Sequence, residues 1–529
     1  MHYVIGSGPA GVACAQALLD SGKTVIMLDA GLRLEPERQK VIAEMARYSP
    51  DKWHVDWQSL IREGMKASTS GVPFKRTFGS DFPYREVDRH LPTDELNIGL
   101  RPSLAQGGLS NVWGAAMLPY SERDLRGWPL QTTDLAPHYE AVVRLTGLAG
   151  RQDDLARWAP LYTNTPSALR LSEQAEHLLA HLQRHRSSLA RDGWHFGHSR
   201  LAVTGAPGTG GSGCVYCRAC MYGCPYGYIY NSAATLVQLR AHPRFSYQPD
   251  VIVETVAETS GAVTIRGYDR KTLARREWRA ERVFSAAGPI ATTRLLLWSR
   301  QAFGHRVWLR DSQYFLFPLL LPGTRGDPLQ ESLHTLSQIF VEVMDDRMDS
   351  HTVHTQLYTC NDLLVGAVGS ALRFRHADRS ALARSLARRL AIAQSYLHSD
   401  HSSRIAVSLS APAGGAPPRL RLEAEINPEA ARRARQVVWQ FVRKARRIGA
   451  LALPPLLQLT PPGRGHHTGG SFPMRSQPGE FETDLLGRPA GWQRVHAVDS
   501  TIFPTIPATT ITLSVMANAH RIATSAAQL

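Results

Sequence analysis

The chain has 529 residues, a mass of 58.4 kDa, 43% hydrophobic and 20% charged residues, and a mean hydropathy of -0.23. This length exceeds one typical domain and the composition argues against disorder, so we expect a folded protein with two interleaved domains. The formal charge of +15 comes mostly from arginines spread along the whole chain. Because no basic and aromatic motif for RNA or DNA accompanies this charge, we expect no nucleic-acid partner.

The sequence gives no sign of a membrane segment or an export signal. No uninterrupted apolar run reaches the roughly 18 residues that a membrane-spanning helix needs, so no span is predicted. The first strand-like residues, 2–5, follow Met1 directly and leave no room for a signal peptide. We therefore expect a cytoplasmic protein.

Residues 2–29 predict a strand, a glycine turn, a helix and a second strand. Gly6 permits the tight turn, Gly8 lets the backbone approach a pyrophosphate, and Gly11 lets the helix pack closely on the strand. Asp29 ends the second strand, where a carboxylate can accept hydrogen bonds from adenosine ribose hydroxyls. This pattern predicts dinucleotide binding, with an ordinary glycine-rich turn as the alternative, and by itself it does not choose between FAD and NAD.

A second buried strand is predicted within RVFSAAGPIATTRLLLWS, residues 282–299. It ends in a small-residue turn that contains Ala287 and Gly288, and a helix follows. A distant strand that returns to such a turn is typical of flavoproteins whose FAD domain is interrupted by other segments. This feature favours FAD.

The C-terminal third, with GRGHHTGGSFPM and then RVHAVDSTIFPTIPATTITLSVMANAHRIA, resembles the glucose-methanol-choline (GMC) oxidoreductases, FAD enzymes that oxidise alcohols. His466 matches the histidine of the family pattern, Asp499 matches its later acidic residue, and residues 516–523 match its closing helix. SLAQGGLSNVWGAAM, residues 103–117, resembles the family segment beside the flavin ring. The flavin-binding residues that the resemblance implies there are Gly108, Ser110, Asn111, Trp113 and Gly114.

The resemblance implies a mixed α/β and α+β fold in which a Rossmann-like FAD-binding domain is built from discontinuous segments. We assign residues 1–120, 201–300 and 455–529 to this domain and residues 121–200 to a helical cover. Residues 301–454 are expected to form a substrate domain on a mainly antiparallel sheet, because runs such as 337–346 and 401–411 alternate in polarity. This segment also contains Tyr358, Asp362, His351 and His354, which could meet a polyol, but the sequence does not place them in the pocket.

His466 is the expected catalytic base, because a neutral imidazole can accept the hydroxyl proton of an alcohol. Where the family has a second active-site Asn or His, this chain has Thr510, whose hydroxyl can hydrogen-bond a substrate or the cofactor but does not titrate near neutral pH. His467 is the alternative base, although neighbouring side chains on an extended segment usually point to opposite faces. Both histidines could also be structural.

Four of the six cysteines, Cys214, Cys217, Cys220 and Cys224, lie in a predicted loop over residues 211–228. Their spacing, C-x2-C-x2-C-x3-C followed by proline, matches the bacterial ferredoxin run, in which the fourth cysteine ligates a second cluster. Because no second cysteine set exists here, Cys224 either completes the same 4Fe-4S (or 3Fe-4S) cluster or is spare. Structural zinc and unligated cysteines are the alternatives. The loop also resembles the Cys-rich iron-sulfur loop of some bacterial sugar dehydrogenases related to the GMC family.

The resemblance implies an FAD-dependent dehydrogenase that oxidises a CH-OH group of a sugar, polyol or amino sugar to an aldehyde or ketone. Hydride would pass to flavin N5, and electrons would leave through the iron-sulfur cluster to an external acceptor. The chain is also similar to FAD dehydrogenases that oxidise sugar hydroxymethyl groups in antibiotic biosynthesis. A cluster-free, O2-dependent alcohol oxidase and a non-redox GMC-like lyase are the alternatives.

Overall fold

The computed structural model describes residues 1–64, 74–205, 213–323, 327–347, 350–371 and 378–529. Its first layer is a five-stranded parallel sheet in the order β20-β9-β1-β2-β5. The strands are β1 (His2–Ile5), β2 (Val25–Leu28), β5 (Phe245–Gln248), β9 (Arg282–Ser285) and β20 (Val495–Ala497). This sheet therefore joins segments that lie far apart in the sequence, which confirms a Rossmann-like layer of discontinuous segments.

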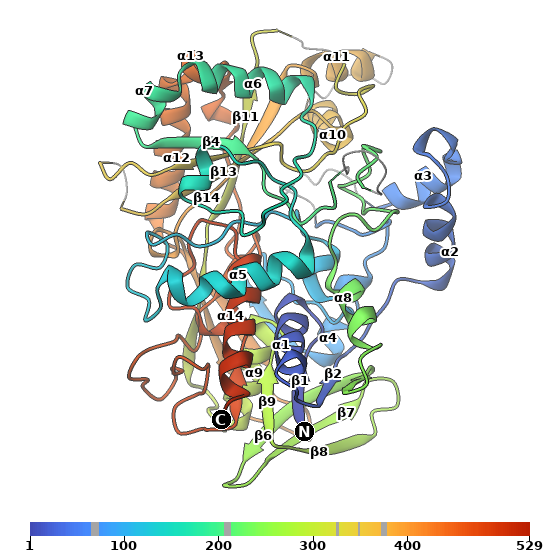
Figure 1. The fold of residues 1–529 in the computed structure, drawn as a ribbon, viewed down its shortest axis with the longest axis vertical. Helices are drawn as coiled ribbons and strands as arrows, with labels where there is room; N and C mark the ends of the chain where they lie inside the picture. Colours follow the sequence, from blue (N-terminus) through green and yellow to red (C-terminus); the bar gives the residue numbers. More distant parts are fainter. Residues whose placement is uncertain (65–73, 206–212, 324–326, 348–349, 372–377) are drawn as a thin grey trace.

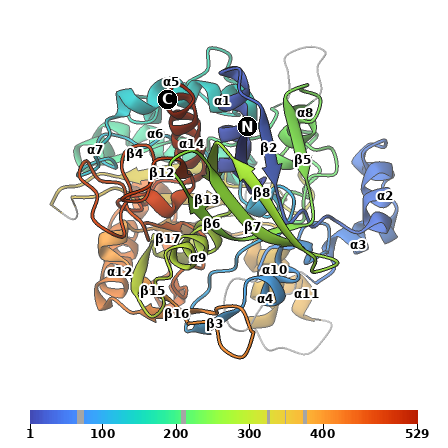
Figure 2. The same cartoon turned by 90° about the horizontal axis from the view of Figure 1, so that it is seen from below.

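Helices cover this parallel sheet. The helix α1 (Pro9–Asp20) follows β1 and packs against α14 (Thr512–Ala526), which in turn contacts α5 (Thr132–Thr146). Figure 1 shows α1 and α14 side by side in the lower half of the molecule, where both chain termini also lie. The helices α8 (Ser232–Leu239) and α9 (Pro289–Ser299) complete this region. A small antiparallel sheet of β6 (Val251–Glu258), β7 (Val263–Asp269) and β8 (Arg275–Ala280) closes the lower end, seen from below in Figure 2.

The second large layer is a seven-stranded antiparallel sheet in the order β17-β11-β14-β13-β12-β4, with β18 also paired to β11. Its strands are β4 (Trp194–His198), β11 (Tyr314–Leu320), β12 (Ile339–Val343), β13 (Val353–Tyr358), β14 (Leu390–Tyr396), β17 (Leu451–Ala452) and β18 (Gln458–Leu459). A mainly antiparallel second sheet is thus confirmed. The segment 121–200 gives this sheet its edge strand β4 as well as helices.

The two faces of the seven-stranded sheet differ, because successive side chains on a strand point to opposite sides. One face carries Phe315, Phe317 and Ala393 into a core shared with α6 (Glu173–Arg184) and α12 (Pro428–Arg443). In Figure 1, α6 lies near the top with α7 (Arg186–Arg191) and α13 (Ala445–Ile448), and α12 lies beside the strands β4 and β13. The opposite face lines a large cavity with Tyr314 and Leu316 of β11, Gln356 and Tyr358 of β13, and Gln394 and Tyr396 of β14.

A third sheet has the order β19-β10-β15-β16-β3. It contains β3 (Thr93–Leu96), β10 (Arg306–Asp311), β15 (Arg404–Leu409), β16 (Leu420–Glu425) and β19 (Thr468–Gly469), and only β16 and β3 pair in parallel. Because β19 pairs with the end of β10, with Thr468 opposite Asp311, it anchors the loop that carries His466 and His467.

The remaining helices lie outside these layers. They are α2 (Pro36–Met45), α3 (Val55–Arg62), α4 (Val87–His90), α10 (Asp362–Ala371) and α11 (Asp378–Ala387). Figures 1 and 2 show α2 and α3 projecting from one side of the body. Among the described residues, no helix combines the length and the apolar character needed to cross a membrane.

Candidate active site

A cavity of about 1480 Å³ is lined both by the parallel sheet with its turns and by one face of the seven-stranded sheet. Most of the side chains and backbone segments that the sequence singles out meet in it. The predicted residues along its walls are Gly6, Gly8, Asp29, Gly108, Ser110, Trp113, Gly114, Ala287, Gly288, His466, His467, Asp499 and Thr510. Gly11, Asn111 and the four clustered cysteines lie outside this wall.

The turn between β1 and α1 needs its glycines for close backbone contacts. The φ of Gly6 is +99°, and a Cβ there would lie 2.6 Å from the Ala286 carbonyl oxygen. A Cβ on Gly11 would lie 1.9 Å from the Gly6 carbonyl oxygen, so Gly11 allows the helix to sit against the turn. Gly8 caps α1, and a Cβ there would meet no atom within 4 Å. The backbone at Gly8 is therefore open to the cavity.

Asp29 is buried at the end of β2 and is held in place by two residues that the sequence gave no reason to select. Its carboxylate accepts hydrogen bonds from the Ser7 N-H (3.2 Å), the Ser7 hydroxyl (2.6 Å) and the Tyr247 hydroxyl (2.8 Å). Burial raises the pKa of Asp29. Asp29 also lines the cavity, so its side chain lies beside any ligand bound there.

The segment after Gly107 folds into a short 3-10 turn, Gly108–Asn111. The Asn111 amide donates to the Gly108 carbonyl (2.7 Å) and accepts from Asn231 Nδ2 (2.7 Å), so Asn111 shapes the turn instead of facing the cavity. Trp113 does face the cavity, and its Nε1 donates to the Tyr230 carbonyl (2.9 Å).

Asp499 joins the end of β20 to the start of α9. One carboxylate oxygen accepts from the Gly288 N-H (2.9 Å) and the Thr292 hydroxyl (2.6 Å), and the other accepts from the Thr501 N-H (2.9 Å). Gly288 is the N-cap residue of α9, so Asp499 satisfies a backbone donor at this helix start. Burial raises the pKa of Asp499.

His466 and His467 both line the cavity, although they are adjacent in sequence. The expectation that they point to opposite faces is wrong, because His466 adopts a left-handed backbone with a φ of 56° and is not in an extended strand. The His467 ring stacks on Tyr396, with centroids 4.7 Å apart, and the His466 ring lies 6.1 Å from Phe74. Among the described residues, neither Nδ1 atom has a hydrogen-bond partner.

The surroundings of the two imidazoles favour their neutral form. Burial lowers the pKa of His466 to about 4, and the positive charge of Arg464 acts in the same direction. Burial also lowers the pKa of His467 to about 3, with smaller contributions from His354 and His466. Both side chains are therefore neutral at neutral pH and able to accept a proton.

Thr510 lies in the cavity wall just before α14. Its hydroxyl oxygen accepts a hydrogen bond from the Leu118 N-H (2.9 Å), which leaves the hydroxyl proton available for donation. Ile511 is the N-cap residue of α14 and also lines the cavity, so the cavity borders the positive end of this helix.

The cysteines Cys214, Cys217, Cys220 and Cys224 are free thiols around a second, small cavity of about 20 Å³. Within the described part of the chain, no three of their sulfur atoms lie within 4.8 Å of one another. A tetrahedral zinc site holds its sulfurs about 3.8 Å apart, from Zn-S bonds of about 2.3 Å. The sulfur atoms are therefore not arranged for zinc. Residues 211 and 212 of the predicted loop lie outside the described residues.

Lys75 lies between the two cavities and was not anticipated from the sequence. It lines the large cavity, and its ammonium donates to the Trp113 carbonyl (2.9 Å). Burial lowers the pKa of Lys75 to about 8, while negative charge on Cys220 and Cys224 raises it. The lysine is therefore within electrostatic range of the cysteine loop.

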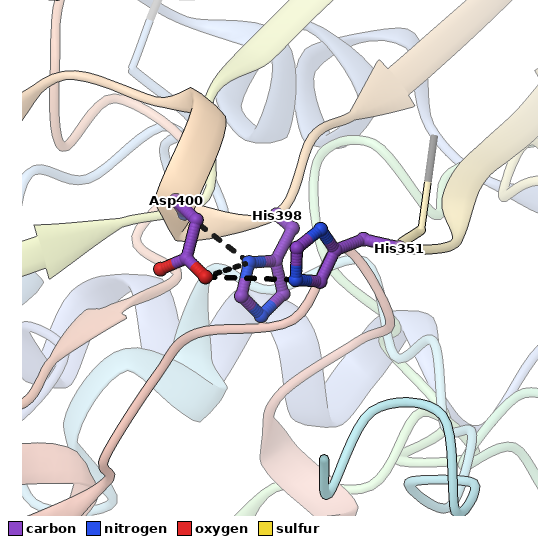
Figure 3. Close-up of side chains that lie close together, drawn as sticks. All are labelled: His351, His398 and Asp400. Atoms are coloured by element: carbon purple, nitrogen blue, oxygen red, sulfur yellow. Dashed lines mark hydrogen bonds and ion pairs between the residues drawn. The ribbon is translucent and has the colours of Figure 1, made fainter. Parts of the chain in front are cut away.

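A separate cluster of His351, His398 and Asp400 has one ligand-type atom per residue within 4.8 Å of the others (Figure 3). The two imidazole rings are stacked 3.8 Å apart, and each lies 3.5 Å from Asp400 Oδ2. The Asp400 N-H already donates to His398 Nδ1 (3.1 Å). The contacts within the cluster account for its geometry, and we assign it no ligand.

No family model matches the chain. It is 26% identical to 6'''-hydroxyparomomycin C oxidase of Streptomyces lividus, over 57% of this chain and 50% of that protein. It is also 26% identical to 2-methyl-1,2-propanediol dehydrogenase of Mycolicibacterium austroafricanum (58% and 52%) and to paromamine 6'-oxidase of Streptomyces fradiae (56% and 49%). The chain thus spans about half the length of these curated relatives.

The whole fold is similar to that of a solved structure, pyridoxine 4-oxidase from "Mesorbium loti". The superposition has a TM-score of 0.59 and covers 99% of this chain and 98% of the other, at 14% sequence identity. The shared architecture therefore extends across both large sheets.

Proposed function

We propose that this chain is a GMC-type, FAD-dependent oxidoreductase that oxidises a CH-OH group of a sugar, polyol or amino sugar to an aldehyde or ketone. One observation carries the proposal: His466 and His467 line the same cavity as the open backbone at Gly8 and the carboxylate of Asp29. The names of the relatives, which are oxidases and a dehydrogenase of hydroxyl-bearing compounds, support the same reaction class.

The cavity fits FAD at both ends. Gly8 and Asp29 would hold the pyrophosphate and the adenosine ribose, since the first offers open backbone and the second is a carboxylate in the cavity wall. The turn 108–114 and the start of α14 would flank the flavin ring, and the unpartnered Nδ1 atoms of the two histidines lie along the same cavity. Bound there, FAD supplies the hydride acceptor.

The protein supplies proton transfer and orientation. His466, neutral at neutral pH, accepts the hydroxyl proton of the alcohol. Thr510 donates its free hydroxyl proton to the substrate oxygen, because its own oxygen is already an acceptor for Leu118 N-H. His467, held by its stack on Tyr396, contributes to positioning that oxygen.

The direct test is anaerobic mixing of FAD-loaded protein with a panel of sugars, polyols and amino sugars, including paromamine. We expect at least one of them to bleach the flavin absorbance near 450 nm within seconds. A lyase would leave the flavin oxidised with every compound, and that result would overturn the proposal.

The cysteine loop is proposed to hold a 4Fe-4S or 3Fe-4S cluster, which supplies one-electron transfer to an external acceptor. The donor set is the basis of this proposal, because four thiols line one small cavity and cysteine thiolates are the ligands of iron-sulfur clusters. Tyr216 and Arg218 have left-handed φ values of 57° and 65°, a backbone that suits anion-binding nests.

Iron and acid-labile sulfide analysis of anaerobically purified protein tests the cluster. We expect three to four iron atoms per chain, lost in Cys217→Ser and retained in the matched control Cys360→Ser, since Cys360 lies outside the loop. Protein that binds FAD and oxidises an alcohol without iron would instead indicate an O2-dependent oxidase. The oxidase names of two relatives favour this second candidate, which predicts one H2O2 for each substrate oxidised in air.

A further inference from the structure

A chain of four hydrogen-bonded side chains runs from the interior of the seven-stranded sheet to the large cavity. Glu342 Oε1 lies 2.5 Å from His354 Nδ1, and His354 Nε2 lies 3.1 Å from Gln356 Nε2. The Tyr358 hydroxyl donates to Gln356 Oε1 (3.0 Å). Gln356 and Tyr358 line the cavity, whereas Glu342 and His354 stand behind them.

The buried end of the chain fixes the direction of its protons. Glu342 is 4% exposed and His354 is fully buried, so their polar atoms depend on partners within the protein and not on bulk water. Gln356 Nε2 is an amide nitrogen that can only donate, so His354 Nε2 accepts from it, and His354 Nδ1 carries the proton that it donates to Glu342 Oε1.

At the cavity end of these four hydrogen-bonded side chains, Tyr358 is consequently a hydrogen-bond acceptor. Gln356 uses its N-H toward His354 and its oxygen toward Tyr358, so the single proton of Tyr358 points back into the chain. The Tyr358 oxygen also interacts with the Ser337 hydroxyl, and its second lone pair is what it presents to the cavity. The neighbouring Gln394 adds a second acceptor. Its Nε2 donates to the Tyr396 hydroxyl (2.5 Å), so its carbonyl oxygen stays available to accept a hydrogen bond.

The acceptor lies beside the segment expected to flank the flavin. An added Cβ on Gly114 would lie 3.5 Å from the Tyr358 hydroxyl oxygen, so Gly114 leaves space next to Tyr358. The wall of the cavity at this point therefore combines an ordered acceptor with a neighbouring residue that has no side chain.

We propose that Tyr358, ordered by Gln356, His354 and Glu342, forms a substrate subsite that binds a hydroxyl or amino group as a hydrogen-bond donor. The inference rests on the proposed function and adds the substrate class of that site. Tyr358 contacts the substrate, whereas Gln356, His354 and Glu342 are positioning residues.

The test measures binding and not turnover. FAD-loaded protein is reduced with dithionite under anaerobic conditions, and the affinities of glucose and of the set of monodeoxyfluoroglucoses are measured by calorimetry. Each of these sugars has fluorine in place of one hydroxyl group. A hydroxyl can donate a hydrogen bond, whereas fluorine cannot. In the wild-type protein, we expect replacement at one or more positions to weaken binding at least tenfold.

Two variants and a control identify the source of this penalty. In Tyr358→Phe, fluorine at that position should weaken binding less than twofold relative to glucose, because the acceptor is gone. We call this loss of affinity the fluorine penalty. In Gln356→Met the tyrosine stays but its proton is released toward the cavity, so the penalty should fall below threefold. Tyr314→Phe, on the same face of the sheet but outside the chain of hydrogen bonds, should keep the full penalty.

The outcomes separate this inference from the proposed function. Flavin bleaching by a sugar, together with a fluorine penalty that survives in Tyr358→Phe, overturns the subsite and leaves the proposed function intact. A second outcome also overturns the subsite: the sugar with fluorine at the position that Tyr358 contacts binds more tightly than glucose. That result would mean that the Tyr358 hydroxyl donates a proton to the substrate instead of accepting one. Failure of every sugar, polyol and amino sugar both to bind and to bleach the flavin refutes the proposed function itself.

Discussion

His467 and Tyr396 are stacked with their ring planes 19° apart, and this contact joins the C-terminal histidine loop to the cavity face of the seven-stranded sheet. We expect Tyr396→Phe to retain the stack and to change the rate of flavin reduction by less than about twofold, whereas Tyr396→Ala should lower it about tenfold by releasing the imidazole. Rapid-mixing measurements compare the three proteins. Equal losses in the Phe and Ala variants would show that the hydroxyl matters and the stack does not.

The pH dependence of flavin reduction should show an unusually low acidic limb. Because burial and Arg464 lower the pKa of His466 to about 4, the imidazole is neutral and able to accept a proton at any pH well above that value. The rate constant per bound substrate should therefore stay level from pH 8 to about 5.5 and fall only as the pH approaches 4.

Arg464→Gln provides the matched variant for this profile. Removing the positive charge raises the pKa of His466, so the acidic limb should move to higher pH. The opposite result would be an acidic limb centred near pH 6.5 in the wild-type protein and unchanged in Arg464→Gln. It would contradict the claim that the surroundings keep the His466 imidazole neutral.

Gly8→Ala should separate cofactor binding from folding. A Cβ at Gly8 meets no protein atom within 4 Å, so the melting temperature of the FAD-free protein should change by less than about 2 °C. The methyl group would nevertheless stand where the pyrophosphate is expected, and FAD affinity should fall at least tenfold. Gly261→Ala, also without a neighbour within 4 Å, is the control. Normal FAD affinity in Gly8→Ala would place the dinucleotide elsewhere.

The buried His496 should make the protein less stable in mild acid. Burial lowers its pKa to about 4, while the unfolded chain keeps a value near 6.5. Between these values the unfolded state binds a proton that the folded state does not, so the stability present above pH 6.5 is lost as the pH falls toward 4. At pH 5 one such histidine costs about 2 kcal/mol.

His496→Gln tests that assignment, since glutamine keeps a donor for the Leu486 carbonyl but does not titrate. The difference in free energy of unfolding between pH 7 and pH 5, measured by urea denaturation, should be smaller in the variant. The same difference in both proteins would remove His496 as a source of the acid sensitivity.

Local patterns were enough to predict part of the parallel layer. The spacing of Gly6, Gly8 and Gly11 sets a strand, a turn and a helix within a few residues, and the structure has β1 and α1 there. The alternation over residues 337–346 likewise predicted a strand, found as β12. Such signals are readable because they depend on neighbours in the sequence.

Other features depend on contacts between distant segments and left no local signal. The left-handed backbone of His466 brings two adjacent imidazoles to one cavity, and the sheet pairing that anchors this loop involves Thr468 and Asp311. Lys75 and Tyr358 become cavity residues only through packing of loops and strands far from the glycine turn. Periodicity shows that residues share a face, but not which face meets the cavity.

The central claim is that an imidazole in this cavity takes the alcohol proton while the flavin is reduced. Anaerobic stopped-flow reduction of FAD-loaded His466→Ala, with the bound flavin confirmed by its spectrum, tests it most directly. We predict a rate constant 10² to 10⁴ times lower than that of the wild-type protein, with a smaller loss in His467→Ala. Reduction of His466→Ala at the wild-type rate would contradict the account.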